Sequence, residues 1–517
     1  MGDVAAAVNY CFDRFSLDLD RGILLMDGCE IAIRPKSFAL LHFLLEHAGR
    51  VLGHDAIADA VWPGVIASDA SIAQCVRDIR RVLGASGQTL LRTVPRRGYV
   101  FSDPVHRKQN SAAAVVEPPV TRLPIVAVLS FAPLYGEQTD NQLGLAVAEE
   151  IATELCNSRA LMVRSYHSYD RGTVALADLV RLIRDTGAQY VLDGSLRQAA
   201  GNVRVLARLI DSCSGACLWG RAYSRSIDDI AAVSGELGVS VSWDVAGAIN
   251  VVEQRQALRG PLEGLSAFQL HQRGLWHLSH GSPAHNDEAA GLFRKAIGLD
   301  PFYGAPYAGL ALTHFNDGVV YGTRQATQSL EAAVLAVRTA IDLDPDDAES
   351  RATYAIIRVG VGQVHDAWDE VTRASLNQTI TPWVKGAQGT VQQYIGEPAA
   401  GRTILQESLR LAPRDPRNAL LLTQVAISYY SEENYAASAE AARRGAIFYP
   451  EYPLLQRWLA AALGQLGRIE EAKRALHNAR SLSPASFDFY VGQRPAWFHT
   501  DQYELLLEGL QKAGLRR

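Results

Sequence analysis

The sequence predicts a multidomain α+β protein. A small helical domain with a terminal hairpin precedes a mixed α/β domain and an all-α region of repeated helices. Three observations support this division. The 517 residues are far more than one hydrophobic core can organise. Short strands and amphipathic helices extend to about residue 104 and end in a basic hairpin, and a strand-like apolar run follows at 124–131. From about residue 265 onward, alanine-rich helices are separated by prolines.

Composition narrows the class of protein. Apolar residues make up 48% and charged residues 20% of the chain, which is typical of globular domains. The net charge of −5 excludes a polycation that coats nucleic acid, so any DNA binding needs a local basic patch. Six cysteines do not make a disulfide framework. Neither a signal peptide nor an apolar stretch of about 18 residues is present, so we expect a cytoplasmic protein without membrane contact.

The first predicted helix covers residues 34–45, with proline near its start. A second short helix is expected over 55–61, ending at Trp62 and Pro63. Apolar residues of the first helix recur at helical spacing and therefore predict a face that packs into a core. The residues of this face are Phe38, Leu41, Leu44 and Leu45.

A third helix is predicted over 69–83, with Ser68 or Asp69 as its N-cap. Its apolar residues follow steps of four, three and four, which places them on one buried face. A hairpin is expected over 90–101, and Gly98 suits a positive φ in its turn. The predicted core residues of the helix are Ile72, Val76, Ile79 and Leu83.

Charge is distributed unevenly within this first domain. Residues 1–73 carry a net charge of −5, whereas residues 74–108 hold eight Lys or Arg against two Asp, a net charge of +6. A basic helix followed by a basic hairpin is typical of a surface that binds the DNA backbone. A charged helix face can also be merely solvated. Because the helix and the hairpin share the same sign, we favour DNA binding.

The motifs of this domain resemble the winged-helix DNA-binding domain of the OmpR/PhoB type. They are Pro35-Lys36, Val61-Trp62-Pro63, the stretch from Ser71 to Gly84, and Thr93-Val-Pro-Arg-Arg-Gly-Tyr99. The last motif is similar to the wing of ToxR-, CadC- and HilA-like regulators. The resemblance implies DNA contacts from residues of the third helix and of the wing. These are Ser71, Gln74, Cys75, Arg77, Asp78, Arg80 and Arg81 on the helix, and Thr93, Arg96 and Arg97 on the wing. Asp78 and Cys75 depart from the family pattern, so base recognition is expected to differ.

Residues 105–123 are small, polar and proline-containing, which predicts a linker. Residues 124–254 then alternate between strand and helix patterns, and their phrases resemble the TolB-like domain. That resemblance implies a fold and no catalytic set. Asp193-Gly-Ser195 is interpreted as a turn at a strand end, with a nucleotide contact as the alternative. No phosphate-binding loop or nucleophile motif occurs here.

Residues 265–517 contain an internal repeat. A phrase ending in Leu-x-Pro recurs at Pro301, Pro345 and Pro413, and a looser form ends at Pro450 and Pro484. The spacing approaches 34 residues, which resembles tetratricopeptide repeats; a non-repeating helical bundle is the alternative. Small residues should allow neighbouring helices to approach closely, and a glycine should occupy one interhelical turn. These residues are Ala296, Ala340, Ala446 and Gly467.

Four histidines cluster within 15 residues, at 271, 277, 280 and 285. His277 and His280 could share a helix face, and we expect Pro283 to end that helix. No tight set of carboxylates or cysteines completes a metal motif. We therefore interpret these histidines as solvated or packing residues.

Together these patterns predict a bacterial one-component, sequence-specific transcriptional regulator with no catalytic residues, cofactor or metal. Residues 1–104 bind double-stranded DNA through helix 69–83 and wing 90–101. Residues 105–123 form the linker, 124–254 the middle domain and 265–517 the repeats. Expected partners are the transcription machinery, a protein or peptide in the repeat groove, and a second copy on DNA. The alternative is an enzyme or nucleotide-binding sensor whose activity resides in the middle domain.

Overall fold

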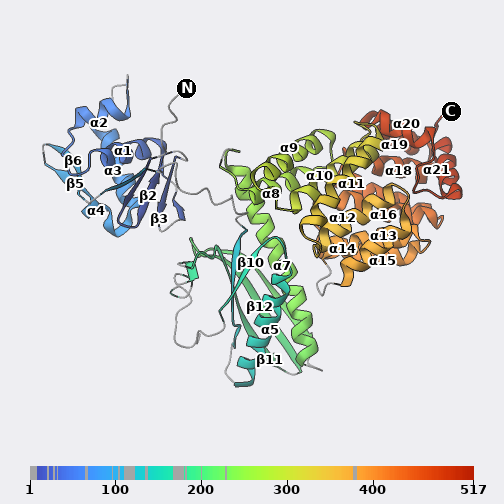
Figure 1. The fold of residues 1–517 in the computed structure, drawn as a ribbon, viewed down its shortest axis with the longest axis horizontal. Coiled ribbons are helices and arrows are strands. Elements are labelled where there is room, and N and C mark those ends of the chain that lie inside the picture. Colours follow the sequence, from blue (N-terminus) through green and yellow to red (C-terminus); the bar gives the residue numbers. More distant parts are fainter. Residues whose placement is uncertain are drawn as a thin grey trace. The chain divides into compact units, whose positions relative to one another are not determined.

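The computed structural model describes residues 8–19, 22–26, 29–31, 33–63, 68–95, 97–102, 105–109, 123–133, 138–166, 178, 180, 183–184, 186–199, 201–226, 230–262, 264–376 and 381–516. It divides into two compact units, residues 1–117 and 118–517. The labels of helices and strands follow Figure 1. No helix among the described residues is both long and apolar enough to cross a lipid bilayer.

The first unit opens with an antiparallel sheet. Its strands are β1 (Val8–Phe12), β2 (Phe15–Asp18), β3 (Ile23–Met26) and β4 (Cys29–Ile31), and β7 (His106–Gln109) pairs with β1. The start of the predicted linker is therefore a strand. Its composition is polar, but backbone hydrogen bonds to β1 hold it in the sheet, and such pairing leaves no local sequence signal.

The three helices that the sequence predicts for this unit are confirmed. They are α1 (Pro35–Glu46), α2 (His54–Val61) and α3 (Asp69–Val82). On α1 the buried face differs slightly from the expected one, because Leu40 is fully buried whereas Phe38 is only half-buried. The hairpin consists of β5 (Leu91–Val94) and β6 (Gly98–Phe101), preceded by the short α4 (Gly87–Leu90).

The middle domain is a mixed sheet in the order β10-β8-β11-β12-β13. Helices α5 and α7 lie together on one face of this sheet (Figure 1), where their apolar residues join its core. The strands are β8 (Ile125–Leu129), β9 (Ala132–Pro133), β10 (Met162–Tyr166), β11 (Tyr190–Ala199), β12 (Asn202–Asp211) and β13 (Cys217–Ser226), and the helices are α5 (Gln138–Cys156) and α7 (Ile230–Arg259).

The turn predicted at Asp193-Gly-Ser195 is wrong, because these residues lie inside β11. Asp193 is fully buried and forms an ion pair with Arg208 on β12. Gly194 lies under the ring of Phe131, which a Cβ would approach to 2.1 Å. The glycine marks close packing inside the sheet, as glycines in strands often do. Residue 254, where we expect the middle domain to end, lies within α7.

Paired helices form the rest of the chain. Gly467 adopts a φ of 71° between α18 and α19, as expected. Ala296 and Ala340 are fully buried, as expected for small residues at helix contacts. In the repeat phrase that ends at Pro450, the small residue at the contact is Gly445, which packs against Leu455, whereas Ala446 is half-buried. The helices are α8 (Ala267–Leu278), α9 (Pro283–Leu299), α10 (Ala305–Phe315), α11 (Ala326–Leu343), α12 (Ala348–Gly360), α13 (Val364–Leu376), α14 (Pro382–Tyr394), α15 (Pro398–Leu411), α16 (Asn418–Ser431), α17 (Tyr435–Phe448), α18 (Pro453–Gln465), α19 (Ile469–Leu482), α20 (Pro484–Gly492) and α21 (Thr500–Lys512).

Pro283 is the first residue of α9, so the expectation that it ends the preceding helix is wrong. Helix α8 ends at Leu278, five residues before Pro283. Proline is favoured in the first turn of a helix because the N–H that it lacks would have no partner there. The Oγ atom of Ser282 caps α9 by accepting a hydrogen bond from the amide of His285.

Candidate nucleic-acid interface

Helix α3 begins at a side-chain cap. The Oγ atom of Ser68 accepts a hydrogen bond from the amide of Ser71 at 3.3 Å, so of the two predicted candidates Ser68 is the N-cap and Asp69 is the first helical residue. Ile72, Val76 and Ile79 are buried in the core of the unit. Their spacing turns the opposite face of the helix to solvent. The exposed residues on that face are Ser71, Gln74, Arg77 and Arg81.

Asp78 lies beneath this face and is only 4% exposed. Its carboxylate accepts hydrogen bonds from Arg34 and Arg81, each at 3.2 Å, and from Gln74 at 3.3 Å. Gln74 in turn accepts from Arg77 at 2.8 Å. A buried carboxylate with charged donors fixes the positions of those donors, because an unpaired charge there would be costly. Asp78 thus orders the polar surface of α3.

Arg80 connects α3 to the hairpin. Its guanidinium donates to the carbonyl oxygen of Leu91 from Nε at 3.0 Å and from Nη2 at 2.8 Å. Nη2 also lies 2.8 Å from Oγ1 of Thr93. The half-buried Arg80 therefore holds strand β5 in a defined position relative to α3.

The hairpin turn depends on Gly98. This glycine has a φ of 118°, which confirms the predicted positive value, and a Cβ there would lie 1.9 Å from the carbonyl oxygen of Leu52. The neighbouring Tyr99 exchanges two backbone hydrogen bonds with Leu52, at 3.0 and 2.8 Å. The loop between α1 and α2 therefore supports the hairpin from one side.

The ten predicted contact residues divide into three groups. Ser71, Gln74, Arg77, Arg81, Thr93 and Arg97 are exposed on α3 or on the hairpin. Cys75 and Asp78 are buried, and Arg80 is half-buried. Arg96 lies outside the described residues.

Two cations of this surface were missing from the predicted contacts. The side chain of Arg34 is 66% exposed although it pairs with Asp78. Arg92 is exposed on β5. Arg92 had a sequence signal, since it contributes to the basic segment 74–108. Arg34 had none, because it precedes that segment and is brought to α3 by the fold.

The histidine cluster belongs to the second unit, at the start of the repeats. Nδ1 of His277 is 2.9 Å from Nδ1 of His285, and the rings of His280 and His285 stack at 4.2 Å. His271 is buried, and its Nδ1 lies 3.3 Å from the hydroxyl of Tyr303. Among the described residues, no group of three or more His, Cys, Asp or Glu is arranged to hold a metal ion.

Comparison with protein families identifies the first unit. The family described as "Transcriptional regulatory protein, C terminal" matches residues 28–101, which extend from β4 to the end of β6. Residues 28–101 form a DNA-binding domain of the OmpR/PhoB type. The third helix of this domain is α3, and the β5–β6 hairpin takes the place of the wing. The region from α8 to α21 resembles tetratricopeptide-repeat proteins in its paired helices.

Two curated relatives match over most of the chain. "Putative adenylate cyclase 3" from Rhizobium meliloti is 26% identical over 368 residues, 68% of this chain and 60% of that protein. The transcriptional regulator HilA from Salmonella typhi is 22% identical over 438 residues, 81% of this chain and 73% of that protein. This chain thus spans less than two thirds of the length of the cyclase relative.

The OmpR/PhoB-type domain also matches a solved structure, the DNA-binding domain of CadC from Escherichia coli. That match has 24% identity and covers 20% of this chain and all of the CadC domain, with a TM-score of 0.19.

Proposed function

We propose that the chain is a sequence-specific transcriptional regulator that binds double-stranded DNA through α3 and the wing. The observation that supports this best is that both α3 and the wing expose cationic side chains. These are Arg77 and Arg81 on α3 and Arg97 on the wing, within a DNA-binding type of domain. A helix of this kind fits the major groove, and basic wing residues suit the phosphate backbone or the minor groove.

The proposed roles follow from exposure. Gln74 and Arg77, on the outer face of α3, are the base-reading residues. Arg81, Arg97 and Arg92 contact phosphates, with Ser71 and Thr93 as hydroxyl donors. The sequence predicts that Cys75, Asp78 and Arg80 contact DNA directly. We propose instead that these three residues support α3 and the wing. Their burial and internal hydrogen bonds suit residues that position α3 and the wing.

A titration of the full chain with fluorescent duplex DNA at several salt concentrations tests this proposal. We expect the logarithm of affinity to fall with that of salt at a slope of about −4 to −5, since about five phosphates are neutralised. Arg77→Ala should alter the preferred sequence, whereas the matched change Asp59→Ala, at an exposed residue of α2, should not. No binding to any duplex at low salt would contradict the proposal.

The remaining partners are also proposals. We propose that a protein or peptide binds the repeats and thereby carries the signal, since stacked helix pairs form extended binding surfaces. Binding as at least a dimer on DNA, contact with the transcription machinery and a cytoplasmic location complete the hypothesis. The TolB-like nature of the middle domain, and limits near residues 104, 123, 254 and 265, belong to the same proposal.

A second candidate function comes from the relative named as an adenylate cyclase, which matches 68% of this chain. An enzyme or nucleotide sensor in the middle domain would agree with that name. Incubation of the purified chain with ATP and a divalent cation, followed by measurement of cyclic AMP, tests this alternative. Product above a boiled control would favour the cyclase, whereas DNA binding without product favours the regulator.

A further inference from the structure

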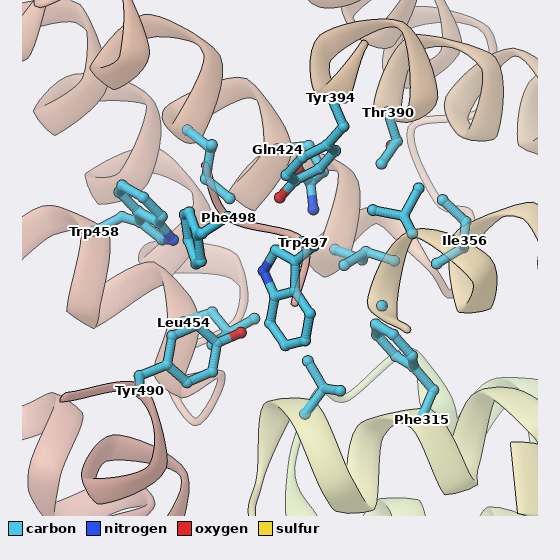
Figure 2. A pocket seen from close by; sticks show the side chains of 15 residues that line it. Phe315, Ile356, Thr390, Tyr394, Gln424, Leu454, Trp458, Tyr490, Trp497 and Phe498 are labelled. Atoms are coloured by element: carbon cyan, nitrogen blue, oxygen red, sulfur yellow. The ribbon is translucent and has the colours of Figure 1, made fainter. Parts of the chain in front are cut away.

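Several helices of the repeats together line an aromatic pocket. It is lined by side chains of α10, α12, α14, α16 and α18, among them Phe315, Ile356, Tyr394, Gln424 and Trp458. Figure 2 shows that Trp497 points into the middle of this set, with Phe498 beside it and Tyr490 nearby. A free space of only about 30 Å³ remains. The pocket is therefore filled by residues from the end of the chain.

These filling residues belong to a segment that we name the plug, residues 484–499. It comprises α20 and the non-helical stretch 493–499. Phe487, Tyr490, Trp497 and Phe498 of the plug are each less than 9% exposed. The plug crosses from α19 to α21, and both of these helices pack on α18 independently of it.

Two glycines of the repeats make room for the backbone of the plug. A Cβ at Gly322 would lie 2.3 Å from the amide nitrogen of Ser486, and one at Gly362 would lie 2.9 Å from the Cβ of Ala496. Both glycines have positive φ values, 61° and 81°. Ser486 also donates from Oγ to the carbonyl oxygen of Val319 at 3.2 Å. The repeats thus present a surface shaped for a peptide backbone with aromatic side chains.

The plug leaves some hydrogen-bond donors of Arg457, a residue of α18, without an acceptor. Arg457 is fully buried. Its described contacts are a hydrogen bond from Nη2 to Ser486, a polar contact with the side chain of Tyr490, and the ring faces of Tyr490 and Phe487 at 3.8 and 5.8 Å. Its Nε and Nη1 atoms have no hydrogen-bond partner among the described residues. Among the described residues no carboxylate pairs with it, although a buried guanidinium normally requires one.

We propose that the plug is an internal substitute for a partner segment that carries an aromatic side chain and a carboxylate, and that this partner displaces the plug from the pocket. The aromatic side chain of the partner would take the place of Trp497. Its carboxylate would pair with Arg457, where the plug offers hydroxyls and ring faces but no charge. A bidentate carboxylate would satisfy the two unused nitrogen atoms, and this gives the partner its advantage over the plug.

The distances fit a carboxylate close in sequence to the aromatic residue. The ring of Tyr490 lies 5.7 Å from the ring of Trp497 and 3.8 Å from the guanidinium carbon of Arg457. A Glu or Asp within two residues of the aromatic side chain can therefore reach Arg457 once Tyr490 has left. This inference rests on the proposed role of the repeats as the site of partner binding.

Two capped peptides added to the full chain provide the test. One is Glu-Pro-Ala-Trp-Phe-Asp-Thr, an acidic form of the plug sequence, and the other is its neutral form Gln-Pro-Ala-Trp-Phe-Asn-Thr. We expect the acidic peptide to bind about tenfold more tightly, and to increase amide hydrogen exchange at residues 493–499. Equal affinities, no binding of either peptide, or unchanged exchange would overturn the proposal.

Variants separate displacement from simple packing. Trp497→Ala weakens the binding of the plug to the pocket and should raise the affinity of the acidic peptide about fivefold or more. If Trp497 served packing alone, the same variant would leave the affinity for the peptide unchanged or lower it. Trp497→Phe is the milder form if the first variant lacks a native circular dichroism spectrum. Arg457→Gln should abolish the preference for the acidic peptide. A retained preference would contradict the role of Arg457.

The DNA titration in the same samples keeps the two proposals apart. DNA binding without peptide binding overturns only the present inference. Peptide binding without DNA binding overturns the proposed regulator and leaves the plug proposal intact.

Discussion

At the scale of single residues, Asp78 shows how a charge on the proposed recognition helix can serve structure. A carboxylate on a DNA-facing helix would repel phosphates if it were exposed. Here it is buried and accepts hydrogen bonds from Arg34, Gln74 and Arg81, so it neutralises part of the basic surface and orders the rest. The departure from the family pattern thus has a local physical reason.

We expect Asp78→Ala to lower the free energy of unfolding of the first unit by about 1–3 kcal/mol, because three donors lose their buried acceptor. DNA affinity should also fall, since Arg81 and Gln74 lose their fixed positions. Urea unfolding followed by circular dichroism measures the first effect. The exposed control Asp59→Ala should change stability by less than about 0.5 kcal/mol.

Arg97 offers a prediction about phosphate contacts. Its exposed side chain lies at the wing turn, so Arg97→Ala should weaken binding to all duplexes by a similar factor. The slope of affinity against salt should decrease by about 0.9, the value for one phosphate contact. Titrations against two unrelated duplexes measure both quantities. A change in preference between the duplexes would instead indicate a base contact.

At the scale of elements, the position of the wing depends on close contact between its turn and the α1–α2 loop. Gly98→Ala would place a Cβ 1.9 Å from the carbonyl oxygen of Leu52, at a φ that alanine rarely adopts. We expect a loss of about 2 kcal/mol or more in stability and a marked loss of DNA affinity. Gly53→Ala is the neighbouring control, because its nearest atom is 3.9 Å away. A thermal melt compares the two variants.

Helix α8 contains a buried titratable group. Burial, with a smaller effect of Arg417, lowers the pKa of His271 to about 3. In the unfolded chain the histidine pKa is near 6.5. Between about pH 3 and pH 6.5 the unfolded chain therefore binds a proton at His271 that the folded chain does not bind. This contribution to stability is complete above about pH 6.5 and is lost as the pH falls toward 3, by at most about 1.4 kcal/mol per pH unit.

Urea unfolding of the full chain at about pH 7.5 and pH 5 tests this dependence. His271→Gln should reduce the loss of stability between the two pH values. His477→Gln, at an exposed histidine of α19, should leave that loss unchanged. Equal pH dependence in all three proteins would show that His271 is not responsible.

At the scale of the whole molecule, one recognition helix reads few base pairs, so useful discrimination among genomic sites requires a second copy. We expect the full chain to bind two half-sites, spaced about one helical turn apart, at least about tenfold more tightly than one. Moving the second site by half a turn should remove this gain. Electrophoretic mobility shifts on these duplexes measure it, and independent binding to both sites would contradict dimerisation.

The sequence alone determined the features that local chemistry controls. The N-cap at Ser68, the apolar face of α3, the glycine at the wing turn and the basic segment 74–108 all depend on residues close in the chain. Helix positions and the helix pairs of the repeats were readable for the same reason, since caps, prolines and helical spacing act within a few residues.

Only the tertiary structure decided which of these side chains are available to a partner. The burial of Cys75 and Asp78, the bond from Arg80 to the wing and the strand position of Asp193 depend on residues remote in sequence. The occupation of the repeat pocket by Trp497 is the strongest case, because it joins the end of the chain to helices that begin almost 200 residues earlier. Such contacts arise from packing, which no local pattern encodes.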